Sequence, residues 1–172
     1  MVQYSKTVFK DTVKNFYRKT KLLPVVFTIH PFKPENTFDV ITLASRVLTE
    51  QYNPTFFNYF YEYAPWGFWV VETHQNLVGF IVCIQQDETR GKILMIGVEE
   101  SYRKQGIGSA LLKQVLKTCM SRHITSIELE VATQNTSAIA FYKRHGFRII
   151  ETIPSFYQNN DAAHIMRWDI PG

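Results

Sequence analysis

Two glycines, Gly106 and Gly108, lie between an apolar run at 93–98 and an amphipathic segment at 107–120. The order of strand, glycine loop and helix places both glycines on the first turn of the predicted helix. A glycine has no Cβ, so a bulky anion can approach the free backbone N–H groups, and the positive end of the helix dipole favours its charge. This stretch therefore predicts a binding site for a pyrophosphate.

The spacing of the loop differs from that of other phosphate-binding loops. It lacks the third glycine of the G-x-G-x-x-G dinucleotide fingerprint, and no Gly-Lys-Ser/Thr of a Walker loop follows. The loop reads Arg103-Lys104-Gln105-Gly106-Ile107-Gly108. This Arg-x-x-Gly-x-Gly pattern resembles the acetyl-CoA pyrophosphate loop of the GNAT superfamily of N-acetyltransferases. A core helix that merely begins at a glycine is the alternative interpretation.

A second stretch, residues 129–147, resembles the GNAT motif L-x-V-x-x-x-N-x-x-A-x-x-x-Y-x-x-x-G-F at every named position. Together the motifs imply an α/β (α+β) fold over residues 25–170: a mixed, mostly antiparallel sheet, splayed at a central V-shaped notch and flanked by about four helices. The notch, between the glycine-loop strand and the strand at 127–131, would receive the pantetheine arm of acetyl-CoA. The resemblance implies cofactor contacts from Ile96, Gly97, Val98, Arg103, Lys104, Gln105, Gly106, Ile107, Gly108, Ser109, Asn135 and Tyr142.

A third match narrows the branch. Residues 48–52, Leu-Thr-Glu-Gln-Tyr, resemble the Leu-Pro-Glu-Asn-Tyr segment of N-terminal (Nα) acetyltransferases of the archaeal and ribosomal-protein type. Residues 150–152 followed by Phe156 and Tyr157 resemble their closing loop, which is usually Tyr-Tyr. Thr49 replaces the proline, and Phe156 replaces one tyrosine and its hydroxyl. The resemblance implies that Tyr52 and Tyr157 contact the substrate.

The reaction requires a neutral amine that attacks the thioester carbonyl. An N-terminal α-amine has a pKa near 7.7–8.0 and a lysine near 10.4, so neutralising the lysine at pH 7 costs about 4.6 kcal/mol. An α-amine is therefore the easier acceptor. The resemblance places Glu50 near the amine, and we expect it to act as the base through a water molecule. Glu130 is the reserve candidate and a substrate contact, because strict alternation turns its strand face toward the cleft.

Two further groups complete the predicted chemistry. The backbone N–H of Val98, next to Gly97 where the strand can bulge, is the position in the family that donates to the developing oxyanion. The leaving thiolate has a pKa near 8.5, so the phenol of Tyr142, with an ordinary pKa near 10, can supply a proton or a hydrogen bond. Asn135 would hold the pantetheine amides. The expected mechanism is direct transfer in a ternary complex without a metal.

Composition limits the class of protein. The chain has 172 residues, a mass of 20.1 kDa and 45% hydrophobic residues, as expected for one globular domain. It contains no apolar run of about twenty residues and begins without the apolar core of a signal peptide, so we expect a cytoplasmic protein away from membranes. Cys83 and Cys119 fit core positions. A net charge of +4 without interleaved aromatic and basic residues argues against specific nucleic-acid binding.

Residues 1–24 are basic, with six Lys or Arg residues against the single acid Asp11. We expect a basic N-terminal extension, 1–24, before a GNAT acetyltransferase domain, 25–172. The extension is either a solvated segment or an amphipathic helix that touches a ribosomal or anionic surface. The expected partners are protein or peptide N-termini, including nascent chains at the ribosome, and the expected state is a monomer or weak homodimer. The alternative functions are acetylation of lysine side chains or of a small amine such as a polyamine, and acyl-CoA binding without catalysis.

The remaining elements follow from periodicity and turn residues. Strands are predicted at 25–30, 68–72, 77–85, 147–152 and 162–168, and helices at 38–48 and 135–146. Ten aromatic residues between Tyr52 and Trp69 predict a further short helix. Its aromatic side either lines the cleft in part or packs beneath the helix.

Overall fold

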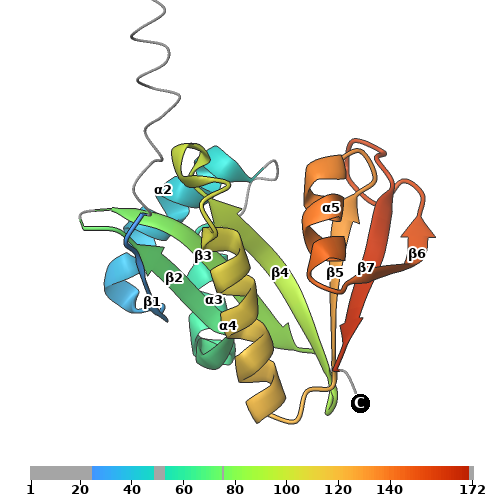
Figure 1. Ribbon diagram of the computed structural model, residues 1–172, viewed down its shortest axis with the longest axis horizontal. Coiled ribbons are helices and arrows are strands. Elements are labelled where there is room, and N and C mark those ends of the chain that lie inside the picture. Colours follow the sequence, from blue (N-terminus) through green and yellow to red (C-terminus); the bar gives the residue numbers. More distant parts are fainter. Residues whose placement is uncertain (1–24, 49–52, 75, 171–172) are drawn as a thin grey trace, which may run out of the picture.

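The protein, described by a computed structural model at residues 25–48, 53–74 and 76–170, is built on one seven-stranded sheet (Figure 1). The strand order is β1-β2-β3-β4-β5-β7-β6, and every neighbouring pair is antiparallel except β4 and β5. The strands are β1 (Thr28–Pro31), β2 (Phe68–Glu72), β3 (Leu77–Gln85), β4 (Arg90–Val98), β5 (Ser126–Ala132), β6 (Arg148–Ile153) and β7 (Ala163–Asp169). The helices are α2 (Thr37–Val47), α3 (Thr55–Tyr63), α4 (Ile107–Ser121) and α5 (Thr136–Arg144).

The predicted fold class is confirmed, including the splayed sheet. β4 pairs with β5 only over Arg90–Lys92 and Ser126–Glu128, after which the two strands diverge. β5 stays paired with β7 along its whole length, so it turns away from β4 together with β7 and β6. The result is a V-shaped notch in the middle of the sheet, visible between β4 and β5 in Figure 1.

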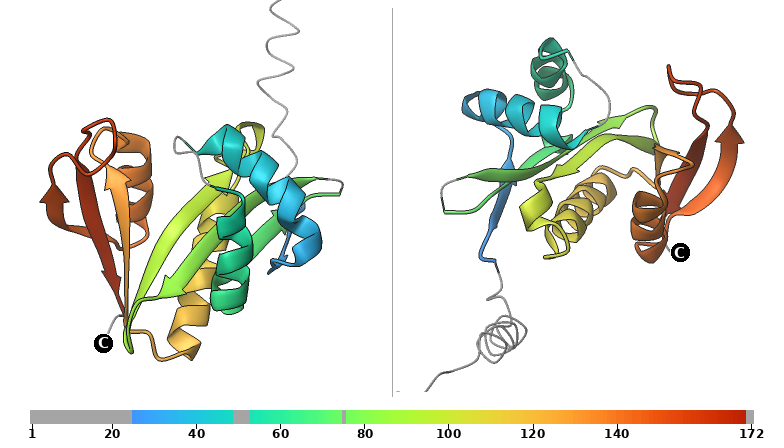
Figure 2. Two further views of the ribbon diagram at one scale, coloured as in Figure 1. Left: turned by 180° about the vertical axis from the view of Figure 1, so that it is seen from behind. Right: turned by 90° about the horizontal axis from the view of Figure 1, so that it is seen from above.

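The helices divide between the two faces of the sheet (Figure 2). α2 and α3 cover one face, where a core that includes Leu43, Phe57 and Phe80 is closed from solvent. α4 and α5 lie on the opposite face over a second core that includes Leu111 and Ile127. The strand β3 is buried over most of its length because it supplies side chains to both cores. No helix in the described part of the chain is long and apolar enough to cross a membrane.

The aromatic helix α3 serves the core rather than the cleft. Phe57 is buried, and its ring lies 6.2 Å from that of Phe80 in an edge-to-face arrangement. Phe56, Tyr59 and Tyr63 face outward and are about half exposed. None of the described residues of α3 lines the pocket in the notch, so the first of the two interpretations of this helix is wrong for them. Its aromatic density reflects the packing of a short helix on a sheet.

The strand β4 is irregular at Leu94. Its pairing with β3 skips this residue, because Val82 faces Met95 while the next residue, Cys83, faces Ile93. An extra residue in one strand bends it and increases its local twist. The bulge lies three residues before Gly97, so the expectation that β4 bulges at Gly97 is wrong. A Cβ on Gly97 would lie 2.6 Å from the Phe80 ring, and close packing is the role of this glycine.

Candidate active site

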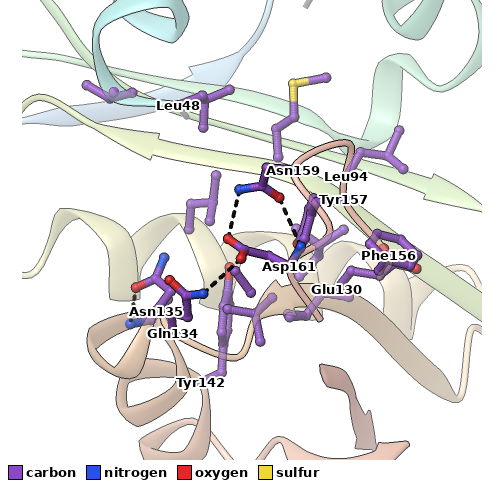
Figure 3. Close-up of a pocket in the computed structure, with 18 of the residues that line it drawn as sticks. Leu48, Leu94, Glu130, Gln134, Asn135, Tyr142, Phe156, Tyr157, Asn159 and Asp161 are labelled. Atoms are coloured by element: carbon purple, nitrogen blue, oxygen red, sulfur yellow. Dashed lines mark hydrogen bonds between the residues drawn. The ribbon is translucent and has the colours of Figure 1, made fainter. Parts of the chain in front are cut away.

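The V-shaped notch contains a pocket of about 1050 Å³ (Figure 3). Its walls come from β4, from β5 and the first part of α5, from the end of α2, and from the loop between β6 and β7. The pocket therefore lies where the two halves of the sheet part, as predicted. Its lining consists of Val47, Leu48, Ile93, Leu94, Met95, Ile96, Leu129, Glu130, Val131, Ala132, Gln134, Asn135, Ala138, Tyr142, Phe156, Tyr157, Gln158, Asn159 and Asp161.

The glycine loop begins α4 as the sequence predicts. Gly106 is the N-cap, and its φ of +89° is a backbone conformation that favours glycine. A Cβ added to Gly106 would have no atom within 4 Å. In the described part of the chain, no acceptor is recorded for the backbone N–H groups of Ile107, Gly108 and Ser109. These first-turn groups have no intrahelical partner by geometry, and together with the helix dipole they can hold an anion.

The rest of the loop is held by its own side chains. Arg103 Nε donates to the Val98 carbonyl at 3.1 Å, and Gln105 Nε2 donates to the Ser101 carbonyl at 2.9 Å. Lys104 is exposed and has a φ of +61°. Arg103 therefore joins the loop to the end of β4 and leaves its terminal guanidinium nitrogens for an anion.

Ser109 connects the two helices beside the notch. Its Oγ lies 3.0 Å from His145 Nε2, and His145 Nδ1 lies 2.8 Å from the Phe141 carbonyl. A carbonyl only accepts, so His145 Nδ1 carries a proton and donates it to the Phe141 carbonyl, while Nε2 makes the hydrogen bond with the Ser109 hydroxyl. The side chain of Ser109 thus ties α4 to α5, and only its backbone N–H faces the anion site. No local sequence pattern signals this contact between residues 36 positions apart.

Tyr142 is the most buried polar side chain of the pocket. The residue is 6% exposed, and burial is the main cause that raises the pKa of its phenol well above the ordinary value, with the charge of Tyr157 as a smaller cause. Tyr142 lines the pocket, and its hydroxyl has no hydrogen-bond partner among the described residues. Such a phenol stays protonated and can donate a hydrogen bond.

Asn135 also has a structural role that was not predicted, as the N-cap of α5. Its Oδ1 accepts from the Ala138 N–H at 3.1 Å, which caps α5. Its amide nitrogen makes no hydrogen bond with the described residues and can donate to a ligand amide. The same residue fixes the start of the helix that carries Tyr142.

The edge of β4 offers backbone donors to the notch. The Glu99 N–H bonds the Val78 carbonyl at 2.9 Å, and in an antiparallel pair the bonding residues alternate along the strand. The N–H groups of Ile96 and Val98 therefore point away from β3, toward the side where β5 diverges. Ile96 lines the pocket, and Val98 lies just beyond it, at the glycine loop.

Glu130 faces the pocket as predicted, but it is ion-paired. Its Oε1 lies 2.5 Å from Lys92 Nζ, and both side chains are largely shielded from solvent. The neighbouring acid on the same strand face, Glu128, bonds Arg167. The fork where β4 and β5 separate is thus closed by two paired carboxylates. This pairing weakens Glu130 as a candidate base, because one of its carboxylate oxygens is already engaged by Lys92.

The acceptor side of the pocket is described only in part. Glu50 and Tyr52, with Thr49 and Gln51, lie outside the described residues. Leu48, Phe156 and Tyr157 all line the pocket. The structure also adds three lining residues that the sequence reading missed, Gln134, Asn159 and Asp161, which form one hydrogen-bond cluster (Figure 3). The contact between Gln134 and Asp161 joins residues 27 positions apart, and neither spacing nor composition signals it.

These features together are typical of the fold of acyl-CoA-dependent transferases: a mixed sheet that splays open, a pocket in the opening between β4 and β5, and a helix that begins at a glycine loop. Residues 37–147 match the acetyltransferase (GNAT) family, and the chain belongs to this family. N-alpha-acetyltransferase 30 of Schizosaccharomyces pombe is 29% identical over 140 residues, which cover 79% of this chain and 93% of that protein. The vertebrate relatives of the same name are longer, and the chain spans 37% to 50% of their length.

Solved structures give the same result. The structure of Ard1 from Thermoplasma volcanium has a TM-score of 0.82 and 34% identity, and the match covers 86% of this chain and 100% of that one. Naa50 of Arabidopsis thaliana, solved with the bisubstrate analogue CoA-Ac-MVNAL, has a TM-score of 0.73 and 27% identity, covering 84% and 99% of the two chains. The resemblance to the Nα-acetyltransferase branch is confirmed.

Proposed function

We propose that this chain transfers the acetyl group of acetyl-CoA to the N-terminal α-amine of proteins and peptides. The observation that carries the proposal is the pocket in the notch between β4 and β5, which Asn135, Tyr142 and Tyr157 line, beyond whose edge β4 leads into the glycine loop that begins α4. Relatives named for Nα-acetylation, and a similar structure solved with an acetylated peptide joined to CoA, support this choice of acceptor.

The chain's own residues divide the work of holding the acyl donor. The backbone N–H groups of residues 107–109 and the guanidinium of Arg103 would bind the pyrophosphate, with Lys104 and Gln105 beside them. The unpaired edge of β4, including Ile96 and Val98, would bind the amides of the pantetheine arm and the thioester carbonyl. Asn135 would contribute its amide nitrogen from the opposite wall.

The acceptor amine attacks the thioester carbon, the C–S bond breaks, and the amine loses a proton. Glu50 is our candidate for the base, through a water molecule, and Glu130 remains the reserve. Tyr142 would donate a hydrogen bond to the departing sulfur. Because burial holds its pKa above that of a thiol, it stabilises the thiolate by a hydrogen bond rather than by full proton transfer. Tyr52 and Tyr157 would position the peptide.

The decisive test supplies purified protein with acetyl-CoA and a library of peptides that begin with different residues. Mass spectrometry should find acetyl groups on the first amine, with release of one CoA per acetylated peptide. A matched library with a blocked α-amine and a free lysine is the control. Acetylation of the blocked peptides at an equal rate would refute the proposal in favour of the lysine or small-amine alternative.

A different measurement tests the remaining alternative, a module that binds acyl-CoA without catalysis. A module that only binds acyl-CoA would retain its affinity for CoA and show no turnover in any library. Calorimetry with CoA and the peptide assay, performed on the same preparation, distinguish the two. A cytoplasmic location, action on nascent chains at the ribosome, and a monomer or weak homodimer remain parts of this proposal.

A further inference from the structure

Asp161 is the centre of the loop that closes the acceptor side of the pocket (Figure 3). Its Oδ1 accepts from Gln134 Nε2 and its Oδ2 from Asn159 Nδ2, both at 2.8 Å. Its backbone N–H donates to Asn159 Oδ1 at 3.1 Å. Its carbonyl accepts from the N–H groups of Phe156 and Tyr157 at 2.9 and 3.1 Å. Every hydrogen-bonding group of Asp161 is therefore engaged.

The loop needs this support because it has little other structure. Residues 154–162 contain no helix or strand and are mostly exposed. Ser155 and Asn160 have left-handed backbones, with φ values of +50° and +65°. Such conformations are unfavourable for residues with a Cβ and persist when surrounding contacts fix them. Asp161 bonds Phe156, Tyr157 and Asn159, which lie between these two positions in the sequence. These bonds fix the turn that carries Phe156 and Tyr157.

The contact with Gln134 joins this loop to the turn between β5 and α5, which lies beside it because Ala132 pairs with Ala163. Gln134 precedes Asn135, the N-cap of α5, and α5 carries Tyr142. The Asp161–Gln134 hydrogen bond thus connects the acceptor loop to the turn that begins α5. Asp161 links the two segments, because its carboxylate bonds Gln134 while its carbonyl bonds the N–H of Tyr157.

We propose that Asp161 is a positioning residue for the acceptor peptide, acting through Gln134 and the backbone of Phe156 and Tyr157. The inference rests on the proposed function, because it assigns the loop to the peptide. A peptide held even slightly out of line reacts poorly, and loss of the link releases the loop without touching the anion site on α4. The defect should therefore fall on the peptide and leave acetyl-CoA binding intact.

The first experiment compares Asp161→Ala with Asp87→Ala. Asp87 performs the same task in the β3–β4 turn, accepting from the backbone N–H groups of Thr89 and Arg90 and from Arg90 Nε, and it does not line the pocket. Asp161→Ala should raise the KM for peptide about tenfold and change the KM for acetyl-CoA by less than about twofold. Asp87→Ala should change neither. Equal effects of both variants on the peptide KM would overturn the inference.

A second set of variants tests the Gln134 contact without deleting a side chain. Asp161→Asn should stay close to wild type, because a turned Gln134 amide can accept from the new NH₂ group. Gln134→Glu alone places two carboxylates together and should raise the peptide KM. The double variant Gln134→Glu/Asp161→Asn restores a donor–acceptor pair and should return the KM to within about threefold of wild type. A double variant as impaired as Gln134→Glu would overturn the proposal.

Amide exchange of residues 154–162, followed by mass spectrometry, gives a readout independent of turnover. Exchange should accelerate in Gln134→Glu and slow again in the double variant. If wild type failed to acetylate any α-amine while exchange followed this order, the proposed function would fall and the link would stand. Unchanged exchange in Gln134→Glu, with wild type active, would refute the link alone.

Discussion

Removal of the Tyr142 hydroxyl should lower kcat and leave the free energy of unfolding nearly unchanged. Tyr142 lines the pocket, and among the described residues its hydroxyl has no hydrogen-bond partner, so Tyr142→Phe leaves none of their groups unpaired. The ring contacts with Phe141 and Phe147, at 5.2 and 5.6 Å between centroids, are retained. The free energy of unfolding should change by less than about 1 kcal/mol. Loss of one donor to a developing charge typically costs about 10²- to 10³-fold in kcat.

The assay follows CoA release with a thiol reagent at saturating acetyl-CoA and peptide. We expect kcat to fall about a hundredfold with little change in the KM for acetyl-CoA, because the lost bond forms mainly to the departing thiolate. Thermal unfolding of the same preparations provides the control for folding. A kcat within threefold of wild type, with both proteins equally stable, would refute the assignment of Tyr142 to the leaving group.

The pH dependence of stability tests the environment of the same phenol. Because burial raises the native pKa of Tyr142 above its unfolded value near 10, the native state keeps a proton that the unfolded state releases above pH 10. Wild type should therefore lose stability relative to Tyr142→Phe as pH rises beyond about 10, and the difference between them should be constant below it. Denaturant unfolding at pH 8 to 11 measures this; a constant difference throughout would show that the phenol is not desolvated.

Three further substitutions test separate parts of the site. Gly108→Ala should fold normally, because its Cβ would meet Phe141 at an ordinary 3.6 Å, yet raise the KM for acetyl-CoA by narrowing the approach to the α4 N-terminus; an unchanged KM would contradict an anion site there. Gly97→Ala, whose Cβ would lie 2.6 Å from the buried Phe80 ring, should lower stability by about 1–3 kcal/mol in thermal unfolding, and an unchanged Tm would argue against tight packing. Glu130→Gln should reduce kcat by less than about tenfold, because Lys92 already pairs the carboxylate; a loss beyond about a hundredfold would make Glu130 the base.

The fold was largely predictable because its signals are local. The alternation at 127–131, the helical spacing after Gly106 and the motif spacing between Asn135 and Gly146 predicted β5, α4 and α5 within one or two residues. Gly146 has the positive φ of +88° expected of a helix-ending glycine. The bulge at Leu94 was not predictable, since no glycine or proline marks the position at which the pairing with β3 shifts.

The site was predictable only where a motif fixes the backbone. The free N–H groups of α4 follow from two glycines, and the placement of Tyr142 follows from its spacing after Asn135. The pairing of Glu130 with Lys92 joins side chains 38 positions apart, and the sequence alone showed an unpaired acid facing a cleft. Such contacts depend on the register in which β4 and β5 pair before they diverge, and no local sequence pattern encodes that register.

The parting of β4 and β5 explains why this fold suits an extended, amide-containing ligand. Beyond Lys92, the inner edges of both strands have peptide groups that no neighbouring strand pairs. The bulge at Leu94 turns β4 aside, and the full-length pairing with β7 carries β5 the other way, so the edges cannot close on each other. An unpaired strand edge favours a partner that offers amide donors and acceptors in line. The two amides of a pantetheine arm meet this requirement, whereas a compact phosphate ester without such an arm would leave the edge of β4 unpaired.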